Sequence, residues 1–240
     1  MRKWRQFLLP GLAIYAAFLT FAGAFAMLNP DIVPALRWRL GLSPYDAASY
    51  KNELHKYHTD KLAFAQQPEV ILLGDSHMQR LDAASLHPNT LNLGIGGLRA
   101  DELHQNLTDY KRLREAKHLI VSIGLNDLEN ATRKAFDQRT KALIEKINAY
   151  DTPWTLLEIL PVDTSQPQDI SNEEIDAANA TLRALCNAPC RFLPTQDFLS
   201  DRNGDLATDL HEGDGQHLNL AGYAALIERL RTTLSQGQTR

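Results

Sequence analysis

The chain has 240 residues, of which 44% are hydrophobic and 22% are charged, with a formal net charge of −4. This composition is that of a globular protein and not of a disordered one. The slight acidity gives no sign of the basic surface that nucleic-acid binding requires, so we expect no nucleic-acid partner.

The first predicted element is a membrane-spanning helix. Residues 7–28 form an uncharged run of about 22 residues, long enough to cross a bilayer. Arg2, Lys3 and Arg5 precede it, and basic residues of this kind stay in the cytoplasm. Small residues between positions 22 and 26 also fit a signal-peptide cleavage site. We favour an anchor over residues 1–29, because the run is long for a signal peptide.

Both interpretations export the rest of the chain. We therefore predict a single-pass protein of the bacterial cytoplasmic membrane, attached through this N-terminal helix. The folded domain would face the periplasm or the cell exterior.

Residues 30–67 read as a juxtamembrane connector. Its first half contains Pro30, Pro34 and Pro44, and residues 45–65 have a helical pattern. The sequence leaves open whether this helix packs on the domain or acts as a stalk.

Residues 68–240 read as one α/β domain. Short apolar runs alternate with helical patterns, which indicates a parallel sheet covered by helices on both faces. The expected strands are residues 70–73, 90–93, 118–123, 154–159 and 190–193, and the expected helices are residues 100–113, 131–148, 171–185 and 220–234. The prediction is a flavodoxin-like three-layer sandwich with a five-stranded parallel sheet.

Polar residues and glycines follow the first three strands. Asp75 and Ser76 come after the first strand, Gly96 and Gly97 after the second, and Asn126 and Asp127 after the third. In an open parallel sheet, ligands bind at the carboxyl ends of the strands. We therefore expect these residues to share one edge of the sheet.

Ser76 lies where a strand turns into a helix. Backbone N–H groups at a helix N-terminus suit a developing oxyanion beside a serine nucleophile. Asp214 stands three residues before His217, so a turn could place its carboxylate on Nδ1 and leave Nε2 free to take a proton. The simpler alternatives are a helix-capping serine and a lone surface histidine.

The second and third segments suggest further oxyanion donors. The glycines at 96 and 97 could bring a backbone N–H close to a ligand, or simply form a turn. A dinucleotide-binding loop is a further alternative, but the full glycine spacing is missing. The Asn126 amide could be a third donor, or a cap. Asp127 reads as structural.

Together these four segments resemble the SGNH hydrolases, also called GDSL esterases and lipases. Gly-Asp-Ser76, Asn92-Leu-Gly-Ile-Gly-Gly97, Gly-Leu-Asn126-Asp and Asp214-Gly-Gln-His217 stand in the order of the family's blocks. The resemblance implies a serine hydrolase acting on ester bonds with Ser76 as nucleophile, His217 as base and Asp214 as the orienting acid. It implies an oxyanion hole of Ser76, Gly97 and Asn126, with no cofactor and no metal.

Two positions depart from the family pattern. His77 stands where many members have Leu, and we do not expect it to be a second base. Leu98 stands where relatives often have a small polar residue, which could alter the pocket rim. We interpret His104, His118 and His211 as surface or capping groups. A metal site around His211 is less well supported than serine chemistry.

Cys186 and Cys190 are close in sequence. In an oxidising compartment this spacing favours a small disulfide loop. The alternative is two unpaired thiols.

Three functions compete. The first is hydrolysis of an ester or thioester, such as an acyl or acetyl group on an envelope lipid or glycan. The second is an O-acyltransferase that passes the same acyl group to an envelope polysaccharide. The third is a non-catalytic envelope binding protein, which the full set of catalytic residues disfavours.

Overall fold

The computed structural model describes residues 20, 21, 25, 47–130 and 132–237. The chain divides into two compact units, Met1–Tyr50 and Lys51–Arg240. Apart from residues 20, 21 and 25, the predicted membrane helix lies outside the described residues. Among the described helices, none combines the length and the apolar character needed to cross a bilayer.

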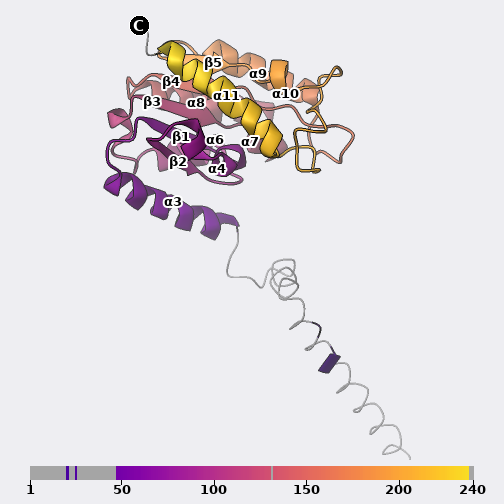
Figure 1. Ribbon diagram of the computed structural model, residues 1–240, viewed down its shortest axis with the longest axis horizontal. Coiled ribbons are helices and arrows are strands. Elements are labelled where there is room, and N and C mark those ends of the chain that lie inside the picture. Colours follow the sequence, from indigo (N-terminus) through magenta and orange to yellow (C-terminus); the bar gives the residue numbers. More distant parts are fainter. Residues whose placement is uncertain (1–19, 22–24, 26–46, 131, 238–240) are drawn as a thin grey trace, which may run out of the picture. The chain divides into compact units, whose positions relative to one another are not determined.

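A five-stranded parallel sheet forms the centre of the second unit (Figure 1). Its strands are β1 (Val70–Gly74), β2 (Thr90–Gly94), β3 (His118–Ser122), β4 (Trp154–Leu157) and β5 (Cys190–Leu193). Their order is β2-β1-β3-β4-β5, the flavodoxin-like arrangement. The predicted five-stranded parallel sheet is therefore confirmed.

The register of the sheet brings the carboxyl ends of three strands level with one another. Gly74 at the end of β1 pairs with Gly94 of β2 on one side and with Ser122 of β3 on the other. The loops that follow β1, β2 and β3 consequently start at the same edge, and β1, in the middle, carries the serine loop.

Alternating side chains of β1 enter two separate hydrophobic cores. Ile71 and Leu73 belong to one cluster, and Val70 and Leu72 to the other. Successive side chains of a strand point to opposite faces, so a continuous apolar run is what a strand buried on both faces needs. This explains why the strand signals in the sequence are short unbroken apolar runs.

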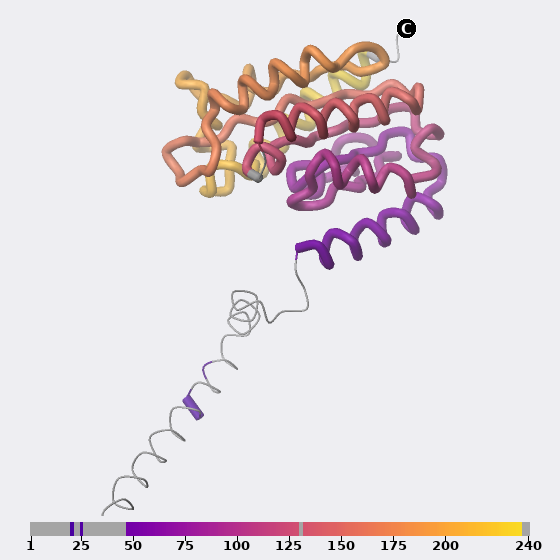
Figure 2. The backbone as a smooth tube through the Cα atoms, turned by 180° about the vertical axis from the view of Figure 1, so that it is seen from behind, coloured from indigo at the N-terminus to yellow at the C-terminus, as the bar shows by residue number. Residues whose placement is uncertain are grey.

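Helices cover both faces of the sheet. The first core receives side chains from α3 (Ala47–Phe64), α6 (Ala100–Asn106), α8 (Arg133–Asn148) and α9 (Asn172–Leu185). The second receives them from α4 (Ser76–Arg80), α5 (Ala83–Leu86), α10 (Gln196–Leu199) and α11 (Leu220–Gly237). Figure 1 shows α11 in front of the sheet, and the reverse view in Figure 2 brings α8 and α9 to the front.

The helix expected over residues 100–113 is shorter in the structure. α6 ends at Asn106, a turn follows, and the short 3-10 helix η1 spans Leu113–Glu115. Leu107, Tyr110 and Leu113 are all buried, so the turn keeps an apolar spacing that resembles a helix. Three short helices among the described residues were not expected: α5, α10 and α7 (Leu125–Asn130), which begins shortly after the third strand.

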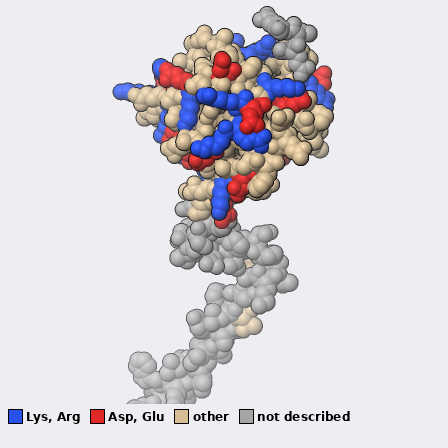
Figure 3. Space-filling view, turned by 90° about the vertical axis from the view of Figure 1, so that its left-hand side faces the viewer, with Lys and Arg blue, Asp and Glu red and all other residues tan. Residues whose placement is uncertain are grey.

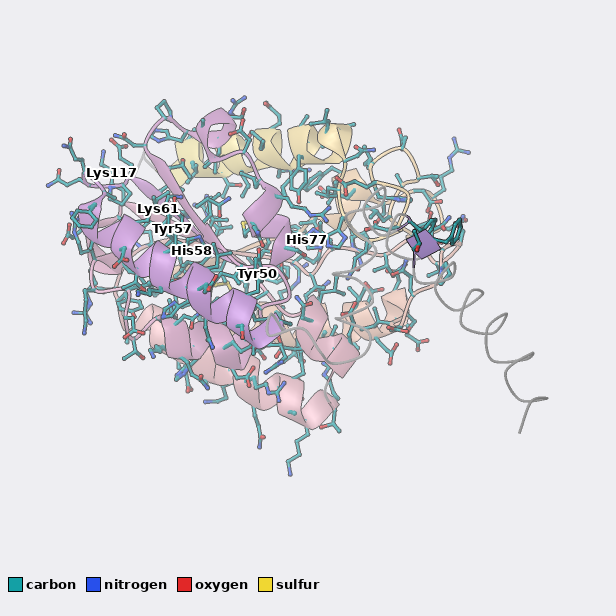
Figure 4. The ribbon with its side chains drawn as sticks, turned by 90° about the horizontal axis from the view of Figure 1, so that it is seen from below. Tyr50, Tyr57, His58, Lys61, His77 and Lys117 are labelled. Atoms are coloured by element: carbon teal, nitrogen blue, oxygen red, sulfur yellow. A yellow bond between two sulfur atoms is a disulfide. The ribbon has the colours of Figure 1, made fainter. Side chains whose placement is uncertain are left out.

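From Lys51 onward, helix α3 packs on the second unit, which decides the question that the sequence left open. Leu62 is buried in the first core, and Lys51 forms an ion pair with Glu102 of α6 at 2.9 Å. Arg112 Nη1 donates to the carbonyls of Leu62, Ala63 and Ala65, which caps the end of the helix. Figure 4 shows Tyr57, His58 and Lys61 along this helix.

Two further expectations concern the cysteines and the surface. Cys186 and Cys190 form a disulfide, which joins the end of α9 to the start of β5.

On the face shown in Figure 3, Lys and Arg lie interspersed with Asp and Glu. Positive charge on this face is thus balanced locally by carboxylates.

Candidate active site

Ser76 is the first residue of α4, directly after the turn that ends β1. Gly74 has φ +141°, and a Cβ added there would lie 1.9 Å from the carbonyl oxygen of Ser122, so no other residue fits the turn. The Asp75 carboxylate accepts a hydrogen bond from the backbone N–H of His77 at 3.0 Å and caps the helix. The serine hydroxyl is therefore held at a helix N-terminus, on the carboxyl edge of the sheet.

His217 lies in the loop before α11 and reaches Ser76 from 141 positions further along the chain. Its Nε2 is 3.0 Å from the Ser76 hydroxyl oxygen, and its Nδ1 is 2.6 Å from Asp214 Oδ2. An ionised carboxylate can only accept, so Nδ1 carries the ring proton. Nε2 is then an acceptor that faces the serine hydroxyl.

The Asp214 carboxylate is ionised at neutral pH. Burial alone would raise its pKa, but hydrogen bonds from the backbone N–H of Gln216 and from His217 outweigh burial and lower the pKa to about 2. Its Oδ1 accepts from the backbone N–H groups of Gln216 and His217 at 3.0 and 2.9 Å. The carboxylate is thus fixed by its own turn while Oδ2 faces the imidazole.

The glycine turn after β2 and the asparagine after β3 lie next to the serine. A Cβ added to Gly96 would be 3.9 Å from Cβ of Ser76, so this turn approaches Ser76 closely. The Asn126 side-chain amide donates to the carbonyl of Leu98 at 3.3 Å, directly after Gly97. The structure therefore joins Ser76, His217 and Asp214 by hydrogen bonds, places the glycine turn beside Ser76, and bonds Asn126 to the end of that turn.

Three neighbouring residues have structural roles. Asp127 is fully buried, and its Oδ2 accepts from the backbone N–H of Ala100 at 2.9 Å, at the start of α6. Burial raises the pKa of Asp127 to about 6. Leu98, considered above for the pocket rim, is 1% exposed and packs in the first core. Asn92 donates to the carbonyls of Met78 and Leu81 and ties α4 to β2.

His77 is buried beside the catalytic histidine candidate (Figure 4). Its ring centroid lies 5.6 Å from that of His217. Neither ring nitrogen has a hydrogen-bond partner among the described residues. Burial lowers the pKa of His77 to about 3, so the ring is neutral at any pH near 7.

Of the two roles expected for His211, surface or capping group, the structure excludes the surface one. His211 is buried, and its Nε2 lies 3.0 Å from Oδ2 of Asp163, in the loop after β4. Sequence reasoning missed Asp163, although it follows a strand at the same edge of the sheet. A separation of 48 residues leaves no local pattern that links the two. His118 is half-buried and lies 2.8 Å from the Thr155 hydroxyl.

No group of three or more His, Cys, Asp or Glu side chains within the described ranges could hold a metal ion.

Comparisons with known proteins agree with this geometry. The family profile of the GDSL-like Lipase/Acylhydrolase family matches residues 72–225, which include Ser76, Asp214 and His217. No curated protein matches the chain.

Several solved structures share the fold. A Streptococcus pneumoniae protein described as a platelet activating factor has 24% identity and a TM-score of 0.73, covering 86% of this chain and 99% of its own. A GDSL-like lipase from Bacteroides thetaiotaomicron has 16% identity and a TM-score of 0.64, covering 76% and 98%. A psychrotrophic esterase from Pseudoalteromonas, inhibited by monoethylphosphonate, has 17% identity and a TM-score of 0.55, covering 72% and 100%.

The profile match spans well over half of the chain, and the sheet order and the residues at its carboxyl edge agree with it. The chain belongs to the GDSL-like lipase/acylhydrolase family of SGNH hydrolases and is an ester-hydrolysing serine hydrolase.

Proposed function

We propose that this chain hydrolyses an ester or thioester with Ser76 as nucleophile, His217 as general base and Asp214 as the residue that orients His217. One observation carries the proposal: a continuous hydrogen-bond chain runs from hydroxyl to imidazole to carboxylate, with distances of 3.0 and 2.6 Å. The directions of these hydrogen bonds are those that proton removal from the serine requires.

In the proposed reaction, Oγ of Ser76 forms a bond to the carbonyl carbon while its proton moves to Nε2 of His217. The tetrahedral intermediate then expels the alcohol or thiol, which takes the proton from Nε2. Water then attacks the acyl-enzyme and gives a proton to the same nitrogen, and Oγ of Ser76 takes that proton as it leaves, which releases the acid and restores the free serine and the neutral imidazole. The ionised Asp214 stabilises the imidazolium that forms in each half-reaction.

The backbone N–H groups of Ser76 and Gly97 and the Asn126 amide would hold the oxyanion. Support comes from the close approach of the glycine turn to Ser76 and from the hydrogen bond that keeps Asn126 beside this turn. Loss of one such donor typically lowers kcat by about 10²–10³. The carbonyl would therefore bind between α4, the glycine turn and the start of α7.

We propose an acyl or acetyl ester of an envelope lipid or glycan as the substrate, and a site outside the cytoplasmic membrane. The apolar run at residues 7–28 supports a membrane anchor. The disulfide between Cys186 and Cys190 supports an oxidising compartment.

Covalent labelling tests the nucleophile. A fluorophosphonate should add to a peptide that contains Ser76 in the purified full-length chain, and hydrolysis of p-nitrophenyl esters should fall by at least about 10⁴-fold in Ser76→Ala. Ser235→Ala, an exposed serine near the end of α11, is the matched control and should keep full activity. Undiminished hydrolysis by Ser76→Ala would refute the proposal.

Protease treatment of spheroplasts tests the location. An exported domain should be digested while a cytosolic marker stays intact, and protection of both would contradict export. Adding an envelope polysaccharide to the ester assay distinguishes hydrolysis from transfer, because an acyltransferase would release acylated glycan in place of free acid.

A further inference from the structure

The loop that carries Asp214 and His217 is built around a buried histidine. The His211 side chain is 1% exposed. Its Nδ1 accepts hydrogen bonds from the backbone N–H groups of Gly213 at 3.0 Å and Gly215 at 3.1 Å. The ring thus fills the inside of the turn, and the two N–H groups that flank Asp214 along the chain point to it.

These hydrogen bonds determine which ring nitrogen of His211 carries the proton. Because Nδ1 accepts two N–H groups, the proton must be on Nε2, which donates to Oδ2 of Asp163 at 3.0 Å. Oδ1 of Asp163 accepts from the backbone N–H of Ser165 at 2.9 Å. Hydrogen bonds from Ser165 lower the pKa of Asp163, so the carboxylate stays ionised and can only accept. His211 is therefore the opposite tautomer from His217.

The loop after β4 also docks directly on the backbone of the catalytic loop. The backbone N–H of Asp163 donates to the carbonyl of Gly215 at 2.8 Å, and Nε2 of Gln168 donates to the carbonyl of Asp214 at 2.9 Å. A Cβ added to Gly215, which has φ +75°, would lie 2.5 Å from Nε2 of Gln168. Figure 1 shows the loops before α11 and after β4 at the same end of the sheet.

The base of the catalytic loop is closed as well. The backbone N–H of Glu212 donates to the carbonyl of His217 at 2.9 Å, and His211 forms an antiparallel bridge with Leu218. Residues 212–217 lie between this closed base and the docked loop. Their conformation therefore depends on a hydrogen-bond acceptor inside the turn for the backbone N–H groups of the turn. In the structure, that acceptor is Nδ1 of His211.

We propose that His211 and Asp163 are positioning residues that hold Asp214 and His217 in their reactive arrangement. The inference rests on the roles proposed above for those two residues and deepens that proposal. Asp163 fixes the tautomer of His211, His211 fixes the turn, and the turn aims the Asp214 carboxylate at His217. A displacement of about 1 Å in such an arrangement can cost about 10²-fold in rate, although neither positioning residue touches the substrate.

Three substitutions separate the two hydrogen-bonding roles of His211: its contact with Asp163 through Nε2, and its acceptor role through Nδ1. His211→Gln can still reach Asp163 with an amide N–H but removes the acceptor for Gly213 and Gly215. His211→Asn keeps an acceptor oxygen near the position of Nδ1 and loses the contact with Asp163. Asp163→Asn must give up its bond from Ser165 or present an N–H to Nε2, which would move the His211 proton to Nδ1, against the two N–H groups.

We expect His211→Gln and Asp163→Asn to lower kcat for p-nitrophenyl acetate by about 10–100-fold with KM changed less than about threefold. His211→Asn should lose less, because the acceptor is restored. His118→Gln is the matched control. His118 also has a side-chain hydrogen-bond partner, the hydroxyl of Thr155, but it lies at the start of β3, away from the site. Melting temperatures measured for every variant separate loss of rate from loss of fold.

The outcomes distinguish this proposal from the proposed function. If Ser76→Ala is inactive while His211→Gln and Asp163→Asn keep the wild-type kcat, the positioning role is wrong. The same conclusion follows if His118→Gln loses as much kcat at an equal drop in Tm. If Ser76→Ala remains active, the proposed function itself fails.

A measurement on the wild-type protein does not depend on whether the variants fold. Long-range ¹H–¹⁵N spectra of the histidine rings in the detergent-solubilised full chain should show the His211 ring protonated at Nε2 and not at Nδ1, with the ring assigned by its nuclear Overhauser contacts to the amide protons of Gly213 and Gly215. Protonation of this ring at Nδ1, or at both nitrogens, would overturn the inference.

Discussion

At the scale of single residues, the site is built on polar groups that have been removed from water. Asp75 is buried directly before Ser76, the proposed nucleophile. Burial, together with the nearby carboxylates of Asp127 and Glu129, raises its pKa to about 7. His77 is also buried, and burial lowers its pKa so that its ring stays neutral. These two residues precede and follow Ser76, so changes at either one test how the surroundings of the nucleophile are stabilised.

Asp75→Asn should stabilise the protein at high pH relative to low pH. The pKa of Asp75 rises from 3.8 to about 7 on folding, so its stabilising contribution is complete below 3.8 and is lost as pH rises through 7. Asparagine keeps the helix cap but does not ionise. The Tm difference between variant and wild type should therefore grow from pH 5 to pH 8, at about 2–4 °C per kcal/mol. A difference that is equal at both pH values would contradict the buried ionisation.

His77→Leu should raise stability and leave catalysis largely intact. The substitution removes two buried nitrogens that lack partners among the described residues, and such atoms cost about 1–3 kcal/mol. We expect a higher urea midpoint and a kcat within about tenfold of wild type, since loss of a general base typically costs about 10²–10⁴. A loss of kcat in that larger range would make His77 a participant in proton transfer.

At the scale of elements, the sequence leaves open whether α3 packs on the domain or extends from it. Two lysines of α3 contact other elements, since Lys51 pairs with Glu102 and Lys61 donates to the carbonyl of Asn92. Backbone carbonyls at the end of the helix accept from Arg112. Leu62 is 2% exposed. The compact unit accordingly begins at Lys51 and includes most of α3.

A fragment that starts at residue 51 should be more stable than one that starts at residue 68. The shorter fragment loses Leu62, whose burial contributes about 1.5–3 kcal/mol, and exposes the core surface beneath α3. We expect its Tm to be lower by at least about 5 °C. Equal melting curves for the two fragments would show that the helix adds nothing to the stability of the unit.

At the scale of the whole molecule, the N-terminal segment and the disulfide near the far end of the chain point to the same compartment. An apolar run at residues 7–28 predicts export, and the cysteine pair at 186 and 190 is the kind of cross-link that persists outside the cytoplasm. The two features are more than 150 positions apart in the sequence. The exported location proposed above would account for both features.

Reduction of the disulfide should lower stability without loss of the fold. For a loop this short, the cross-link contributes about 2 kcal/mol by restricting the unfolded chain. Dithiothreitol, or the double substitution of both cysteines by serine, should therefore lower Tm by about 4–8 °C. The serine variant should no longer respond to the reductant. An unchanged wild-type Tm after complete reduction would contradict this contribution.

Local patterns in the sequence were sufficient for the sheet and for the residues at its edge. Apolar runs that end in glycine predict strands buried on both faces, and the order of Ser76, Gly97, Asn126 and His217 places them after successive strands or before the last helix. These features depend on neighbours along the chain, where periodicity and turn chemistry act directly.

Only the tertiary structure decided how distant segments meet. It packed α3 on the core, ended α6 at Asn106, buried His77 and joined His211 to Asp163. Each of these depends on contacts between residues far apart in sequence, such as the 48 positions between Asp163 and His211. The sequence does not distinguish a buried carboxylate or imidazole from an exposed one. The difference is the hydrogen-bond partner that a buried group requires, and folding brings that partner from a distant part of the chain.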